Sequence, residues 1–128
     1  MGLILIVDDD ASVVESNASA LEASGHTVTT AATTSEALAA IDRETPDVVV
    51  LEALLDGTAA GLDLARSLAS DNPDLPLIML SSIDDHDTYR EHALIDLDDW
   101  MPVHLFMDKP VEPDVLAYEV DHLVKAAS

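Results

Sequence analysis

The sequence predicts an α/β fold in which a five-stranded parallel sheet is flanked by helices on both faces. Over 128 residues, short apolar runs alternate five times with amphipathic stretches of helical period, a pattern typical of parallel sheets with crossover helices. Leu3–Val7 is apolar at every position, as in a strand that is buried on both faces. We expect the strand order 2-1-3-4-5 and a single domain over residues 1–128.

The first half of the chain contains three of the expected strands, of which Leu3–Val7 is the first. A helix is expected over residues 11–24, with Gly25 as its stop signal. A short strand follows over residues 26–31, and residues 33–36 have the form of a capping box that opens a second helix. Residues 47–51 are the next buried strand.

The second half contains the other two strands. Helical periodicity covers residues 62–70, and residues 75–80 are a further buried strand. Residues 83–102 are the least regular stretch, in which a short helix is expected around residues 88–94. The fifth strand is expected at residues 103–107, and Pro113 suits the first turn of a last helix.

The chain is strongly acidic, with 26 Asp and Glu residues against 5 Lys and Arg and a formal charge of −21. Because phosphate contacts need Lys and Arg, this balance argues against direct binding to nucleic acid or to an anionic membrane. There is no Cys, which excludes disulfides and thiol catalysis. No apolar run approaches the roughly 18 residues of a membrane span, so we expect a cytoplasmic protein. The charge itself fits either adaptation to high salt or a merely acidic protein.

Polar residues follow the expected strands at the point where each strand ends. The carboxyl ends of parallel strands share one edge of a sheet, where ligands gather. Carboxylates are ligands for Mg²⁺, and a lysine and a hydroxyl can hold phosphoryl oxygens. The residues predict a phosphoryl or Mg²⁺ site. Helix capping by the aspartates is the alternative, but it leaves Glu52 and Lys109 unexplained. The strand-end residues are Asp8, Asp9, Asp10, Glu52, Ser81 and Lys109.

Four segments resemble the receiver domains of two-component response regulators, and the resemblance covers essentially the whole chain. Residues 4–9 (Ile-Leu-Ile-Val-Asp-Asp) resemble the strand with its acidic pair, and residues 46–51 (Pro-Asp-Val-Val-Val-Leu) the run that leads to the phosphoaccepting aspartate. Residues 77–81 (Leu-Ile-Met-Leu-Ser) and 106–110 (Phe-Met-Asp-Lys-Pro) resemble the later strands. The resemblance implies a flavodoxin-like receiver fold.

The resemblance also implies a role for each matching residue. Asp8 and Asp9 would bind Mg²⁺, and Glu52 stands where the phosphoaccepting Asp is expected. Ser81 and Lys109 would contact the phosphoryl group, and Ser81 and Phe106 would act as switch residues. The implied partner is a sensor histidine kinase or another signalling protein, with an output domain that is fused or separate. The family is a signalling module, so we expect no enzyme activity and no catalytic residues.

The sequence departs from the family pattern in three places. The first is Glu52 itself. The second is the loop over residues 53–61, which is one residue longer than usual and has Asp56 where Pro is common. The third is the stretch between Ser81 and Lys109, which is longer by several residues and contains Trp100.

Glu52 decides the predicted function. Glu is longer than Asp by one methylene, roughly 1.5 Å, which places its carboxylate nearer to where the phosphoryl group should be. We expect phosphotransfer, and Mg²⁺ binding with it, to be weak or absent. Glu52 would then imitate a phosphorylated aspartate or be an inert filler beside Lys109. A working receiver that is phosphorylated at Glu52 or Asp56 is the alternative.

Two other functions fit parts of the sequence. Asp8 and Asp10 resemble the Asp-x-Asp motif of haloacid-dehalogenase-type phosphatases, but the acidic pair that those enzymes place after the lysine is missing. The second of these functions is that of a docking module, which binds a partner without ever being phosphorylated. Trp100 and Tyr118 would anchor a partner or pack locally. Most of the 5 histidines are expected on the surface.

Overall fold

The computed structural model describes residues 2–55, 60–82, 105–109 and 111–127. Its centre is a five-stranded sheet in the order β2-β1-β3-β4-β5, in which each neighbouring pair is parallel. The predicted strand order is therefore confirmed. The strands are β1 (Leu3–Val7), β2 (Thr27–Ala31), β3 (Val48–Glu52), β4 (Leu77–Ser82) and β5 (Leu105–Lys109).

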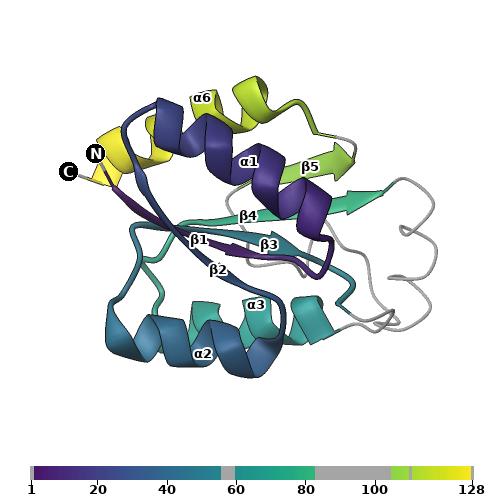
Figure 1. The fold of residues 1–128 in the computed structure, drawn as a ribbon. Helices are drawn as coiled ribbons and strands as arrows, with labels where there is room; N and C mark the ends of the chain where they lie inside the picture. Colours follow the sequence, from purple (N-terminus) through teal and green to yellow (C-terminus); the bar gives the residue numbers. More distant parts are fainter. Residues whose placement is uncertain (1, 56–59, 83–104, 110, 128) are drawn as a thin grey trace.

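Two layers of helices cover the sheet (Figure 1). Helices α1 (Ala11–Ala23) and α6 (Pro113–Ala127) lie on one face, and α2 (Thr34–Arg43) and α3 (Ala60–Asp71) lie on the other. This arrangement confirms the prediction of helices on both faces. Among the helices that the structure describes, none has the length and hydropathy that a membrane span requires.

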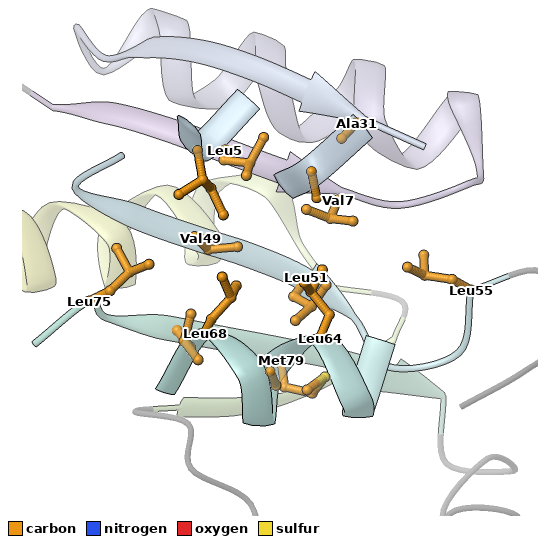
Figure 2. Packing of buried hydrophobic residues seen from close by; sticks show 14 of the residues in the cluster. Leu5, Val7, Ala31, Val49, Leu51, Leu55, Leu64, Leu68, Leu75 and Met79 are labelled. Atoms are coloured by element: carbon orange, nitrogen blue, oxygen red, sulfur yellow. The ribbon is translucent and has the colours of Figure 1, made fainter. Parts of the chain in front are cut away.

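Alternate residues of each strand supply the two halves of the core. In β1, Leu5 and Val7 pack into the cluster under α2 and α3, whereas Ile4 and Ile6 pack into the cluster under α1 and α6. Figure 2 shows the first cluster, in which Val49 and Leu51 of β3 lie between β1 and helix α3. Because both faces are buried, the strands are apolar throughout their centres.

The helix ends match the capping signals. Helix α1 ends one residue before the expected boundary, with Ser24 as its C-cap and Gly25 at φ 99°, a left-handed conformation that favours glycine. At the start of α2, the N–H of Glu36 donates to Thr33 Oγ1 (3.1 Å). The Glu36 carboxylate accepts from the N–H of Ala32 (2.9 Å). The motif is thus a capping box whose return bond is shifted by one residue.

The strand boundaries differ from the expected ones in one direction. The third strand runs one residue further, to Glu52; the fourth covers Leu77–Ser82, and the fifth covers Leu105–Lys109, two residues later than predicted. Apolar runs report burial, whereas the hydrogen-bonded ladder continues into the polar residues at the strand ends. Helix α3, by contrast, begins earlier than predicted, at Ala60, two residues before the first periodic leucine. The helix expected around residues 88–94 lies outside the described residues.

Helix α3 begins in direct contact with the backbone that follows β3. A Cβ atom placed on Gly61 would lie 1.9 Å from the carbonyl oxygen of Glu52 and 2.5 Å from that of Ala53. Real side chains do not approach backbone oxygens this closely, so only glycine fits there. Gly61 therefore sets how near α3 lies to the end of β3.

Gly61→Ala should destabilise the protein. Alanine is the better helix former by about 1 kcal/mol, but its methyl group must displace backbone, and overpacking of this kind costs about 1–3 kcal/mol. Because the obstacle is a carbonyl and not a flexible side chain, we expect a net loss of about 2 kcal/mol in the free energy of unfolding, measured by urea denaturation. Ser67→Ala, an exposed change on the same helix, should stay within about 0.5 kcal/mol. Equal stabilities for the two variants would contradict this account.

The acidic surface predicts that salt stabilises the fold. Among the acids whose burial the structure describes, only Asp8 and Glu52 are buried, so the excess negative charge is at the surface. Raising KCl from 0.1 to 1 M shortens the screening length from about 10 to about 3 Å and weakens the repulsion. Thermal denaturation should show Tm rising by about 5 °C or more over this range. A Tm that is flat or falls with KCl would defeat the idea.

Candidate functional site

The sheet register brings the predicted site residues to one edge. Val7 pairs with Leu51, so Asp8 and Glu52 occupy the next position on each of the two neighbouring strands. Further along the edge, Ser82 pairs with Lys109. The backbone positions expected from the sequence therefore share the carboxyl edge of β1, β3, β4 and β5.

Asp8 is buried directly after β1. It is 3% exposed, and its N–H donates to the carbonyl of Ala31 (3.0 Å), which ties it to the end of β2. Its Oδ1 accepts from the N–H of Asp10 (2.9 Å). The carboxylate is thus held in place by the main chain of the following turn, because a buried polar group needs such a partner.

The three consecutive aspartates do different things. Asp10 is the N-cap of α1, where its Oδ1 accepts from the N–H of Ser12 (3.0 Å) and of Val13 (3.4 Å). Asp9 is exposed at the same turn. Capping therefore accounts for Asp10, whereas Asp8 and Asp9 remain as the two carboxylates beside the strand ends.

Glu52 is the last residue of β3 and is 5% exposed. Its Oε1 accepts from the N–H of Leu54 (3.3 Å), so the side chain folds over the start of the loop that follows the strand. The carboxylate is therefore withdrawn from solvent, and its place beside Lys109 stays a prediction.

The remaining predicted residues are placed to different degrees. Ser81 lies in β4, and Phe106 and Lys109 lie in β5; their expected roles stay predictions. Asp56 and Trp100 lie outside the described residues. Tyr118 on α6 is 61% exposed, and its ring lies 5.3 Å from that of His122. It faces away from Leu116 and Val120, the buried residues of the same helix.

Two buried polar residues were missed by the sequence analysis. His26 is 7% exposed although most of the histidines were expected at the surface. Its position at the start of a strand, two residues before Val28, is the signal that could have found it, because alternate residues share a face. Asn17 is 2% exposed on α1; it lies three residues after Val14 and four before Leu21, which is the spacing of the buried face.

The described groups at the site offer carboxylate oxygens and main-chain donors. The two buried carboxylates belong to Asp8 and Glu52, and Asp9 adds an exposed one. In the part of the chain that the structure describes, no three His, Cys, Asp or Glu side chains form a group that could hold a metal ion. An oxygen site of this kind suits Mg²⁺ only in the mode in which the ion uses one or two carboxylates and keeps several waters.

Comparison with known proteins identifies the family. The family model described as the response regulator receiver domain matches residues 4–121. The phosphate regulon transcriptional regulatory protein PhoB of Pseudomonas aeruginosa is 37% identical over 112 residues, which is 86% of this chain and 46% of that protein. A probable transcriptional regulatory protein, TcrX of Mycobacterium tuberculosis, is 42% identical over 81 residues, 63% of this chain and 34% of that protein. The chain thus spans less than half the length of these relatives.

Solved structures lead to the same family. The receiver domain of NtrX from Brucella abortus is 28% identical with a TM-score of 0.79, and the match covers 95% of this chain and 98% of that one. The receiver domain of a Francisella response regulator is 25% identical with a TM-score of 0.81 and complete coverage of both chains. These matches give no support to the phosphatase alternative. The chain belongs to the response regulator receiver domain family of two-component systems.

Proposed function

We propose that the chain is an atypical receiver, or pseudo-receiver, that signals by conformation-dependent docking to another protein and not by turnover of a phosphoryl group. The observation that carries the proposal is the buried carboxylate of Glu52 at the end of β3, held by the N–H of Leu54 (3.3 Å). Receivers are signalling modules, so we infer no enzyme activity beyond what phosphotransfer itself would require.

The chemistry of phosphotransfer explains why Glu52 matters. A receiver's carboxylate oxygen attacks phosphorus in line with the leaving group, while a metal ion and a lysine hold the phosphoryl oxygens. Such attack needs the reacting atoms at about 3–3.5 Å in one orientation, and a misplacement of about 1 Å costs roughly 100-fold in rate. Glu52 adds a methylene, and its Oε1 is engaged by the following loop. Both features disfavour attack.

The buried Glu52 carboxylate could also imitate a phosphorylated aspartate, because its negative charge is always present. The longer side chain carries its negative charge beyond where an Asp carboxylate would end, towards the place of a phosphoryl group. In the proposed mechanism this charge attracts Lys109 and the hydroxyl of Ser81, and Phe106 follows as the aromatic switch. An inert Glu52 that only fills space beside Lys109 is the competing account. The experiment below measures whether the rest of the pocket is competent.

Mg²⁺ is the implied cofactor, and Asp8 and Asp9 are the residues that would hold it. The ion would supply positive charge for phosphoryl oxygens. One Asp8 oxygen already accepts from the N–H of Asp10, and Asp9 is exposed. Asp8 and Asp9 would give two carboxylates to an ion that keeps several waters, but the first is already engaged and the second is exposed. We therefore propose weak binding of Mg²⁺ or none.

We propose a sensor histidine kinase or another signalling protein as the partner, with Trp100 and Tyr118 as docking residues. The exposure of Tyr118 supports its part in this. The relatives' names point to transcription, and an output domain, fused or separate, would carry that activity. Direct binding to nucleic acid by this chain is disfavoured by its charge of −21. We also propose a cytoplasmic location and a single domain over residues 1–128.

Glu52→Asp should create a phosphoacceptor. The shorter side chain withdraws the carboxylate and reopens the space for in-line attack, while Asp8, Asp9, Ser81 and Lys109 are unchanged. With acetyl phosphate and Mg²⁺, an oxygen of the shortened carboxylate would bond to phosphorus and acetate would leave. Intact-mass measurement should show labelling of Glu52→Asp about 100-fold above that of the natural chain.

Three controls sharpen this experiment. Glu22→Asp makes the same change at an exposed position of α1 and should not be labelled. Glu52→Gln should stay unlabelled, and adding Asp9→Asn to Glu52→Asp should abolish the gain. Labelling of the natural chain would sink the pseudo-receiver proposal and identify Glu52 or Asp56 as a real acceptor. Labelling of neither form would place the defect in the longer loop over residues 53–61 or in the segment after Ser81.

A further inference from the structure

His26 lies at the opposite end of the sheet from the predicted site, in the turn between α1 and β2. Its side chain is only 4% exposed, and main-chain hydrogen bonds fix the backbone on both sides of it. The N–H of His26 donates to the carbonyl of Leu21 (3.1 Å), and the N–H of Thr27 donates to that of Gly2 (2.9 Å). The ring is therefore held at a fixed place beside Gly2, the residue that precedes β1.

Both ring nitrogens of His26 have partners. The main-chain N–H of Gly2 donates to Nδ1 (3.0 Å), and Nε2 is bonded to Oδ1 of Asp121 on α6. An amide N–H can only donate, so Nδ1 must carry a lone pair, and the hydrogen of a neutral ring is then on Nε2. The pairing selects one tautomer, with Nε2–H donating to the carboxylate of Asp121.

These bonds join parts of the chain that are far apart in sequence. Gly2 and His26 are separated by 24 positions, and His26 and Asp121 by 95. The junction is also tightly packed, because a Cβ atom on Gly2 would lie 3.1 Å from Oδ2 of Asp47 and 3.1 Å from Cγ2 of Val124. Gly2, the α1–β2 turn and the C-terminal half of α6 thus meet at one point.

The two halves of α6 are attached to the sheet differently. In the first half, Leu116 and Val120 are fully buried. In the second half, Leu123 and Val124 are only partly buried against the same cluster. Apolar burial alone therefore holds the second half less firmly. The bond from His26 to Asp121 lies at the boundary between them.

We propose that His26, as its neutral Nε2–H tautomer, is a latch that fixes the C-terminal half of α6 to Gly2, the residue that precedes β1. The latch is a conformational device of this chain that is separate from the Glu52 site. The latch fixes the orientation of α6. This helix also carries Tyr118, which lies about one turn before Asp121. Opening the latch releases the end of α6 while the central strands stay folded.

The tautomer can be tested on the unmodified chain of residues 1–128. Nitrogen-15 NMR of the imidazole rings should show His26 with a protonated Nε2 and an unprotonated Nδ1 at neutral pH. His122, which is exposed on α6, is the internal reference. A His26 ring with its hydrogen on Nδ1, or with hydrogens on both nitrogens, would overturn the proposed latch.

Amide hydrogen exchange tests the mechanical role. Asp121→Ala removes the acceptor of a charge-assisted hydrogen bond, so exchange at Leu123 and Val124 should accelerate by about tenfold or more. Asp121→Asn keeps an acceptor oxygen and should restore most of the protection. His122→Ala, the matched exposed change on α6, should alter neither amide.

Two amides in the central strands separate a local effect from a global one. Exchange at Ile6 and Val49 should be unchanged in Asp121→Ala. A rise of equal size at these amides would mean that the variant only lowers global stability, and it would overturn the latch. Unchanged exchange at Leu123 and Val124 would overturn it as well.

Discussion

The parallel direction of all five strands determines where everything else in this molecule lies. Each connection must return across the sheet, so helices cover both faces, and the strands between them are apolar on both sides. The carboxyl ends of β1, β3, β4 and β5 then meet at one edge. Polar side chains can be placed there without entering the core. The candidate site is a consequence of this geometry, and the residues at the strand ends provide its chemistry.

At that edge, burial distinguishes carboxylates that look alike in sequence. Asp10 is exposed and caps a helix, whereas Asp8 and Glu52 are withdrawn from water and bonded to main-chain N–H groups. A buried carboxylate depends on such donors because the protein interior replaces water poorly as a solvent for charge. This dependence gives Glu52 a defined orientation, and it makes the length of the side chain matter.

Much of the fold could be predicted because burial on two faces leaves a clear trace in apolar runs such as Leu3–Val7. The ends of the strands could not be predicted in this way. For example, β5 continues through Asp108 and Lys109, which are hydrogen-bonded in the sheet although they are not apolar. The motifs located Asp8 and Glu52, but composition could not separate the capping role of Asp10 from the burial of Asp8. The burial of His26 follows the alternation with Val28 and was missed, whereas its partner Asp121, 95 positions away, is beyond what a local pattern can report.

The contact of Gly61 with the Glu52 carbonyl has a mechanical consequence. The end of β3 and the first turn of α3 pack backbone against backbone, with no room for a side chain between them. A shift of the Glu52 carbonyl towards Gly61 would therefore press directly on α3, because no flexible side chain is present there to absorb it.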